Sequence, residues 1–202
     1  LRSYNIDKNK IKISPLGYKK FSKLKIEGKI KLDLNFKKLK SSKKQLLILN
    51  SGKQNESKRI SKLIDLIIIL NKKGLNSKLI LIGNPDQDYK VLLKNKIKKL
   101  NFLIGKNKIL LLPMQSREKL RCYLYLSDIA IWPGNPSITI QEALYFNNLI
   151  FLSKENPSSH LLSSELLYFY NEDLYKTARN IIRIKNNNLL RQTIVTKNKQ
   201  IL

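Results

Sequence analysis

The chain has 202 residues, enough for one sizeable domain with a real core, and its 40 basic and 14 acidic residues give a formal charge of +26. Its single cysteine, Cys122, excludes an internal disulfide framework, and its single histidine, His160, argues against a histidine-centred catalytic or metal site. No apolar run approaches the roughly 20 residues of a membrane helix, and no signal segment opens the chain. We therefore expect a soluble cytoplasmic protein. Because the chain begins with Leu1 rather than Met, we also expect it to be the C-terminal part of a longer protein.

The positive charge has two explanations. Clustered cations gain affinity for nucleic acid by releasing counterions, but arginine, which reads base edges, provides only 7 of the 40 basic residues. Lys, Asn and Ile share A/T-rich codons, so a biased genome would produce many solvated lysines without any partner. The composition argues against nucleic acid as a partner. It favours a solvated surface as the explanation of the charge, and leaves a charged polymer or the anionic inner face of a membrane as alternative partners.

Residues 1–44 carry 15 basic and 3 acidic residues and show little periodicity. Within them, "KIKISPLGYKKF" (Lys10 to Phe21) has an alternating, strand-like start followed by a Pro-Leu-Gly turn. We interpret residues 1–44 as a basic interdomain segment that leads into a domain.

From Gln45 onwards the pattern is regular. "QLLILNSG" (45–52) is a continuous apolar run ended by turn residues, which is typical of a parallel strand covered on both faces. A helical spacing of apolar residues follows and stops near Gly74. Further strands are predicted at 78–83, 108–113, 128–133 and 148–152. Further helices are predicted at 91–100, 116–126, 158–167, 172–185 and 189–202, and one more helix follows the turn after 128–133 and ends near Phe146. We predict an α/β fold with a Rossmann-like, doubly wound parallel sheet over residues 45–185, followed by a C-terminal helical tail over 186–202.

Open sheets of this kind bind ligands beyond the carboxyl ends of their strands, where this chain concentrates its glycine-containing and polar loops. The first loop, "SGKQNESK" (51–58), is not a nucleotide P-loop, because Leu47 and Gln54 stand where that motif needs glycine and a hydroxyl residue. Lys53 and Lys58 remain. A lysine in a first helical turn opposes the helix dipole, and an anion bound between the two lysines would relieve this. The alternative is that both lysines are only solvated.

The stretch "IWPGNPSITIQEAL" (131–144) joins a strand to a turn of small residues and then to a helix. The backbone N–H groups of Ser137, Ile138 and Thr139 would be exposed at this turn, and such groups favour phosphate. Glu142 lies about one turn later, where its carboxylate could accept hydrogen bonds from a ribose. The alternative needs no ligand, because Thr139 and Glu142 have the spacing of a capping box.

Taken in order, these segments resemble the C-terminal, donor-binding half of a GT-B glycosyltransferase of family 4, also called glycosyl transferases group 1. The resemblance runs from about Lys10 to Lys185. "NSGKQNESKRISKLIDL" resembles the first strand, the Gly-Arg/Lys loop and the lysine-containing helix of that group. "KLILIGNPDQDYKVLL" resembles its second unit, and the sequence from "KILLLPMQS" to "NNLIFL" (108–152) is similar to the rest of its donor site.

The resemblance implies that a nucleotide-sugar is bound between two Rossmann-like domains without a metal or a cofactor, and that many members retain the anomeric configuration. It also implies a role for each matching position. The diphosphate falls on Lys53, Lys58 and the backbone of Ser137, Ile138 and Thr139, the ribose on Glu142, the base near Pro113 and Met114, and the donor sugar near Gly134 and Asn135.

One position departs from the family pattern. The group's motif is Glu, seven residues, Glu, and its first acid, which normally helps to hold the donor sugar, falls on Gly134. We therefore interpret the chain as a divergent transferase, with an inactive one as the alternative. Elsewhere, we expect Cys122 and Trp132 to be packing residues.

We predict a glycosyltransferase domain that moves a sugar from a nucleotide diphosphate to a cell-surface glycan or lipid-linked acceptor. The resemblance implies that the anomeric configuration of the sugar is retained. Catalysis would need the missing N-terminal domain, and no catalytic residue is assigned. The protein would be cytoplasmic, with peripheral contact at the inner membrane face. Two alternatives stay open: a noncatalytic nucleotide-sugar-binding pseudo-transferase, which Gly134 favours, and a basic nucleic-acid-associated domain.

Overall fold

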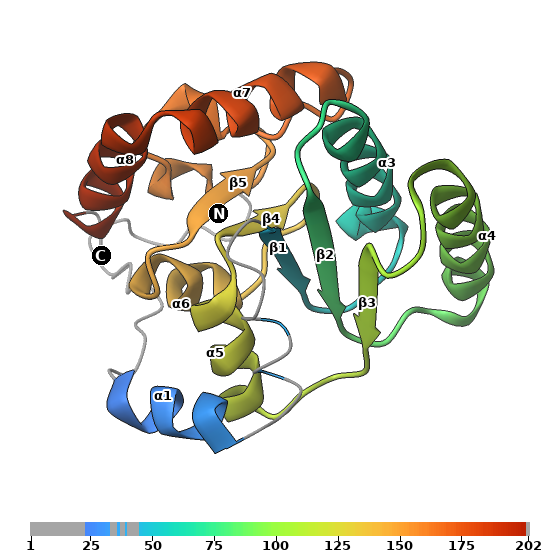
Figure 1. Ribbon diagram of the computed structural model, residues 1–202, viewed down its shortest axis with the longest axis horizontal. Coiled ribbons are helices and arrows are strands. Elements are labelled where there is room, and N and C mark those ends of the chain that lie inside the picture. The colour runs from blue at the N-terminus through green and yellow to red at the C-terminus, as the bar shows by residue number, and fades with distance from the viewer. Residues whose placement is uncertain (1–22, 33–35, 37–38, 40–44, 201–202) are drawn as a thin grey trace, which may run out of the picture.

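The computed structural model describes residues 23–32, 36, 39 and 45–200. The strand-like start and turn expected at 10–21 lie outside the described residues, as does most of the segment 1–44. The described part is an α/β fold in which one parallel sheet is flanked by helices (Figure 1). None of its helices is both long enough and apolar enough to cross a membrane.

The sheet has five strands in the order β3-β2-β1-β4-β5, and every neighbouring pair is parallel. The strands are β1 (Leu46–Ser51), β2 (Ser77–Ile82), β3 (Ile109–Leu112), β4 (Ile129–Trp132) and β5 (Leu149–Leu152). Each of the five strand predictions is confirmed. β1 lies in the middle of the sheet and is buried along its whole length, as its unbroken apolar run indicates.

Alternate residues of the strands enter two separate hydrophobic cores. Leu46 and Ile48 of β1 join the core under α3 (Ile60–Lys72), α4 (Gln87–Ile104) and α7 (Leu174–Asn186). Leu47 and Leu49 join the opposite core, under α1 (Lys23–Leu32), α5 (Arg117–Leu126) and α6 (Thr139–Tyr145). Because successive side chains of a strand point to opposite faces, a sheet covered on both faces follows, and the doubly wound prediction is confirmed.

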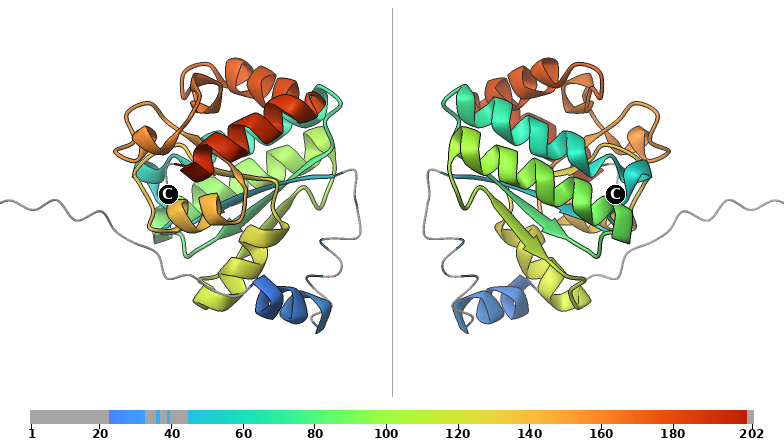
Figure 2. Two further views of the ribbon diagram at one scale, coloured as in Figure 1. Left: turned by 90° about the vertical axis from the view of Figure 1, so that its left-hand side faces the viewer. Right: turned by 90° about the vertical axis from the view of Figure 1, so that its right-hand side faces the viewer.

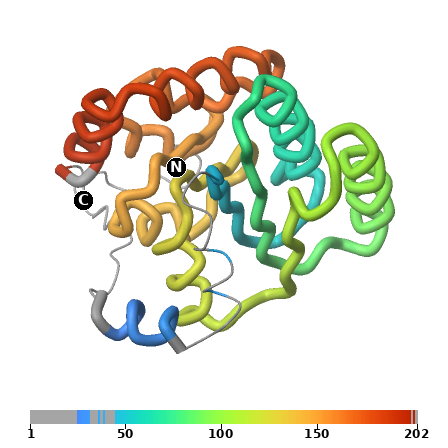
Figure 3. The backbone as a smooth tube through the Cα atoms, viewed as in Figure 1, coloured from blue at the N-terminus to red at the C-terminus, as the bar shows by residue number. Residues whose placement is uncertain are grey.

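Helices cover both faces of the sheet (Figures 1 and 2). α3 and α4 run side by side over one face of the sheet, while α1 and α5 lie together on the other face (Figure 2). The backbone trace shows α8 (Asn188–Gln200) turning back beside α7 (Figure 3). α8 falls in the predicted tail 186–202, and it contributes the buried side chain of Ile194 to the core.

The helix predicted at 158–167 is wrong. The chain instead forms two short 3-10 turns, η4 (Ser159–Leu161) and η5 (Glu165–Leu167), separated by extended backbone. The segment then runs along β5, where Phe169 N–H donates to the carbonyl oxygen of Leu152 at 2.7 Å. Leu167 and Phe169 are buried in the core, so packing against the edge of the sheet takes the place of a continuous helix.

Candidate functional site

The loops after β1, β2 and β4 meet at the carboxyl edge of the sheet, because these three strands are neighbours. The first two loops touch directly: Gln54 N–H donates to the carbonyl oxygen of Asn84 at 3.3 Å. Gly83 has φ +147°, and a Cβ atom there would lie 1.9 Å from the carbonyl oxygen of Gly52. The close approach of the two loops therefore requires glycine at this position.

The turn after β4 packs equally tightly on the 3-10 helix η3 (Glu56–Lys58), which follows β1. Asn135 N–H donates to the carbonyl oxygen of Ser57 at 3.1 Å. A Cβ atom built on Gly134 would lie 2.1 Å from that same Ser57 oxygen. With the backbone in this position, no side chain fits at Gly134, the position where the family motif has its first acid.

Lys58 lies in η3, near the start of α3 as expected and just ahead of the first turn of that helix. Its Nζ atom donates to the backbone oxygens of Asn135, at 3.1 Å, and of Pro136. The alternative that this lysine is only solvated is therefore wrong. Burial lowers the pKa of Lys58 from its ordinary value. Since an ammonium group has three donors, one N–H remains beyond the two that hold the turn.

Lys53 lies near the start of the first loop, and its side chain is mostly exposed. Its Nζ atom is 3.2 Å from Oδ1 of Asp86, which follows β2. Asp86 was not singled out in the sequence. An exposed ion pair of this kind is worth about 0–1 kcal/mol, so Lys53 is available to another anion at little energetic cost.

Side-chain hydroxyls connect the turn after β4 to the end of β1. Thr139 Oγ1 lies 2.8 Å from Ser51 Oγ and 2.8 Å from Ser137 Oγ. The indole N–H of Trp132, which is buried as expected, donates to the backbone oxygen of Ser51 at 2.9 Å. Ile138 precedes α6 with its side chain exposed, and among the described residues the structure gives no acceptor for the backbone N–H of Ser137 or Ile138.

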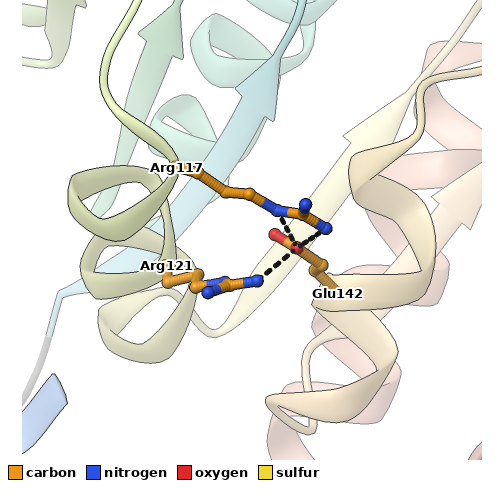
Figure 4. A network of polar contacts seen from close by, with 3 residues as sticks. All are labelled: Arg117, Arg121 and Glu142. Carbon is orange, nitrogen blue, oxygen red and sulfur yellow. Dashed lines mark hydrogen bonds and ion pairs between the residues drawn. The ribbon is translucent and has the colours of Figure 1, made fainter. Parts of the chain in front are cut away.

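Glu142 is almost fully buried in α6, and its carboxylate points at two arginines of α5 (Figure 4). The Nε and Nη2 atoms of Arg117 each lie 2.7 Å from Glu142 Oε1, and Nη2 of Arg121 lies 3.0 Å from the same oxygen. The other carboxylate oxygen, Oε2, is buried and has no hydrogen-bond partner among the described residues.

The capping-box alternative is wrong, because Thr139 is bonded to hydroxyls and Glu142 to α5. The sequence reasoning also missed Arg117 and Arg121. Their spacing was the available signal, since residues four apart lie on one face of a helix. That face had no visible partner in the sequence, because Glu142 is 25 and 21 residues away.

Pro113 and Met114 follow β3, two strands from β1. Met114 is exposed, and its backbone N–H donates to Asn84 Oδ1 at 3.2 Å. Asn84 belongs to the loop after β2, so this hydrogen bond links Met114 to that loop. Among the described residues, no three His, Cys, Asp or Glu side chains gather as a metal site requires.

An open parallel sheet with convergent loops at its carboxyl edge defines a Rossmann-like domain, and this one matches the Rossmann-like domain of GT-B glycosyltransferases. The chain belongs to the glycosyl transferases group 1 family, whose sequence model matches residues 33–201. No curated protein matches the chain.

Three solved structures illustrate the likeness. A UDP-forming trehalose-phosphate synthase from Burkholderia xenovorans superposes with a TM-score of 0.73 at 16% identity, over 87% of this chain and 44% of that one. The C-terminal domain of a glycosyl transferase group 1 protein, LpcC from Francisella tularensis, gives 0.66 at 14%, over 77% and 83%. Sucrose-phosphate synthase from Thermosynechococcus elongatus gives 0.69 at 15%, over 82% and 42%. The chain thus spans less than half of each synthase, and these likenesses establish the fold.

Proposed function

We propose that this domain binds a nucleotide-diphosphate sugar and serves in the transfer of the sugar to a cell-surface glycan or a lipid-linked acceptor. One observation carries the proposal: the ammonium of Lys58 is held against the turn after β4, beside N–H groups of that turn for which the described residues supply no acceptor. A cation and free backbone donors at the edge of a parallel sheet favour a phosphate ligand.

In this proposal the diphosphate lies between Lys53, Lys58 and the backbone N–H groups of Ser137, Ile138 and Thr139. Lys53 would exchange its exposed partner, Asp86, for a phosphate oxygen. Lys58 would keep the turn in place with two N–H groups and use the third for the ligand. No metal or cofactor is part of the proposal, since the two ammonium groups supply positive charge to the diphosphate.

The ribose is proposed to bind Glu142 through Oε2, the carboxylate oxygen that lacks a donor. That oxygen is buried, so a side chain has to shift before a ribose hydroxyl can reach it. Arg117 is the one of the two arginines able to move at small cost, because its side chain is 61% exposed whereas that of Arg121 is 15% exposed. The base is proposed to lie near Pro113 and Met114.

During transfer, the bond between the anomeric carbon and the diphosphate oxygen breaks, and the acceptor oxygen forms a bond to that carbon and loses its proton. Negative charge grows on the departing nucleoside diphosphate. Lys53, Lys58 and the N–H groups of the turn would stabilise this charge, which is the usual electrostatic contribution to such a step. The acceptor site and any catalytic base are assigned to the rest of the protein, and retention of configuration is part of the proposal.

Isothermal titration of the full-length protein with UDP and GDP tests this function. We expect one nucleotide to bind, and Lys53→Ala to lower its affinity about tenfold or more, as for the loss of a charged hydrogen bond. Lys94→Ala, an exposed lysine on α4, is the matched control and should bind like the wild type. No binding of either nucleotide to the folded wild type would overturn the proposal.

A noncatalytic nucleotide-sugar-binding domain is the second candidate, because the backbone of η3 leaves no room for an acid at Gly134. The two candidates differ in one measurement. Protein that binds a nucleotide sugar but neither transfers nor hydrolyses the sugar, across a panel of glycan and lipid acceptors, would establish the noncatalytic one.

We also propose peripheral contact with an anionic membrane through α4. This helix exposes four large apolar side chains: Val91, Leu92, Phe102 and Leu103. Exposed lysines lie among them, at positions 90, 94, 98 and 99. Apolar side chains surrounded by lysines suit the interface of a membrane with anionic lipids, and α4 lies on the outside of the fold (Figures 1 and 2).

A further inference from the structure

A cavity of about 280 Å³ lies beside the turn after β4. It opens between η3, that turn and the loop after β5, and its polar lining includes Ser57, Arg59, Ser153, Glu155 and Asn156. Drug-sized ligands occupy cavities of roughly 300–1,000 Å³, so this one has room for a single small ring and is too small for a nucleotide. Hydroxyl, amide, carboxylate and guanidinium groups in one small cavity suit a polyol.

The cavity is held in shape from two sides. The side chain of Asn156 is buried; its Nδ2 donates to the carbonyl oxygen of Gly134 at 2.7 Å, and its Oδ1 accepts from the N–H of Ser158 at 2.9 Å. These bonds tie the loop after β5 to the turn after β4. The turn is fixed from its other side by η3, through the Asn135 and Ser57 backbones.

Arg59 reaches this cavity from an uncommon backbone conformation. It has φ +53° and ψ +35°, the left-handed region, which is unfavourable for any residue with a Cβ atom. Non-glycine residues kept in such conformations cluster at ligand sites. The conformation ends η3 and begins α3, and it is this break that sets Arg59 in the wall of the cavity.

Among the described residues that line the cavity, Glu155 alone carries a carboxylate. Gly134, also in the wall, contributes backbone alone because no side chain fits there. The structure shows no ion pair between Glu155 and Arg59, or between Glu155 and any other described residue. Its carboxylate is therefore free to accept hydrogen bonds from a ligand's hydroxyl groups.

We infer that this cavity receives the sugar ring of the donor and that Glu155 accepts hydrogen bonds from the sugar hydroxyls. The inference rests on the proposed function, which places the diphosphate on Lys58. The two residues adjoining Lys58, Ser57 and Arg59, both line the cavity, so the ring enters it directly from the diphosphate. Glu155 is thus a residue that determines specificity for the sugar, and it acts from the loop after β5.

The experiment compares nucleotide diphosphates with nucleotide sugars on the same protein. Full-length wild type, Glu155→Gln and Glu172→Gln are titrated with UDP, GDP, UDP-glucose, UDP-N-acetylglucosamine and GDP-mannose. Glu155→Gln keeps the size of the side chain and removes its charge. Glu172 is an exposed acid outside the cavity lining and serves as the matched control.

We expect Glu155→Gln to lower the affinity for the preferred nucleotide sugar about tenfold, as for the loss of a hydrogen bond to a charged group. Its affinity for the parent nucleotide should stay within about twofold of the wild type, and Glu172→Gln should match the wild type for both ligands. Equal binding of the nucleotide sugar by wild type and Glu155→Gln overturns the inference but leaves the proposed function standing. Absence of binding of all five ligands to the wild type overturns both.

Discussion

The Nζ atom of Lys58 lies 3.1 Å from the carbonyl oxygen of Asn135, so a charged side chain after β1 fastens the turn after β4. The same ammonium group also donates to the carbonyl oxygen of Pro136. A residue that the family resemblance assigns to the ligand therefore also holds the ligand's proposed binding turn. Loss of this side chain is therefore expected to lower both the stability and the nucleotide affinity of the protein, whereas loss of Lys53 should lower the affinity alone.

We predict that Lys58→Ala lowers both the stability and the nucleotide affinity of the protein. Two partly exposed hydrogen bonds to the turn are lost, which should cost about 1 kcal/mol of unfolding free energy. Lys53→Ala should lower only the affinity, because its ion pair with Asp86 is exposed. Urea denaturation and titration with UDP or GDP measure the two effects. Equal unfolding midpoints for Lys58→Ala and wild type would contradict the fastening role.

As the pH rises, the affinity for a nucleotide diphosphate should begin to fall at a lower pH than it would if Lys58 had the pKa of an exposed lysine. Burial lowers the pKa of Lys58, so this ammonium loses its proton before exposed lysines do as the pH rises. Lys58→Arg should keep its affinity to higher pH, because arginine stays protonated. Titration from pH 7 to pH 10 measures the difference, and parallel curves for the two proteins would refute the prediction.

The lowered pKa of Lys58 also determines whether the folding stability rises or falls with pH. Between the lowered pKa of Lys58 and the ordinary lysine value, the unfolded chain binds more protons at this site than the folded chain. The contribution of the lysine's ionisation to folding stability therefore rises with pH through that window. The Lys58→Arg variant should lack this rise when the unfolding free energy is followed over the same pH range.

Gly134→Ala should destabilise the protein, because the new Cβ atom would lie 2.1 Å from the backbone oxygen of Ser57. Relief requires a backbone shift, and overpacking of this kind costs about 1–3 kcal/mol. Gly28→Ala is the control: nothing lies within 4 Å of the added atom, and alanine is favoured over glycine inside a helix such as α1. Thermal unfolding compares the two, and equal melting temperatures for Gly134→Ala and wild type would disprove the clash.

Glu142→Gln should also be destabilising, for an electrostatic reason. The change removes the charge of a buried carboxylate that contacts the guanidinium of Arg121, and removing one partner of a buried ion pair costs about 3–5 kcal/mol. Arg117→Gln should cost much less, because the Arg117 side chain is 61% exposed. Chemical denaturation of both variants, with Glu172→Gln as the exposed control, measures the ranking. A larger loss for Arg117→Gln than for Glu142→Gln would contradict it.

Phe102→Ser should weaken binding to membranes if α4 is the contact surface. Phe102 is 89% exposed, and its ring would be withdrawn from the lipid interface by the change. Sedimentation with vesicles of phosphatidylserine and phosphatidylcholine measures binding, which should fall with added salt and with pure phosphatidylcholine. Tyr175→Ser, an exposed aromatic residue on α7, is the matched control. Equal binding by Phe102→Ser and wild type would exclude α4 as the docking surface.

The sheet was predictable because each strand is a short apolar run followed by a turn, and because buried parallel strands need apolar residues on both faces. The stretch 158–167 was not predictable in the same way. Its leucines have helical spacing, yet Leu167 and Phe169 are drawn into the core beside β5, and this tertiary packing overrides the local pattern.

The candidate site shows the same division between local and distant causes. The residues "PGNPS" (133–137) predicted a turn before a helix, and the structure has that turn between β4 and α6. The spacing of Thr139 and Glu142 also suggested a capping box, but the carboxylate is held by arginines more than 20 residues earlier in the chain. The crowding at Gly134 depends on the backbone of Ser57, a contact between two distant loops that no local pattern records.

The buried indole of Trp132 makes the proposed site observable without a label. Trp132 is the only tryptophan in the chain, and its N–H is bonded to Ser51, whose hydroxyl in turn meets Thr139 at the start of α6. Any ligand that tightens or displaces this turn changes the surroundings of a single fluorophore. Intrinsic fluorescence at one emission wavelength would then report occupancy of the turn directly, in real time and at concentrations far below those of calorimetry.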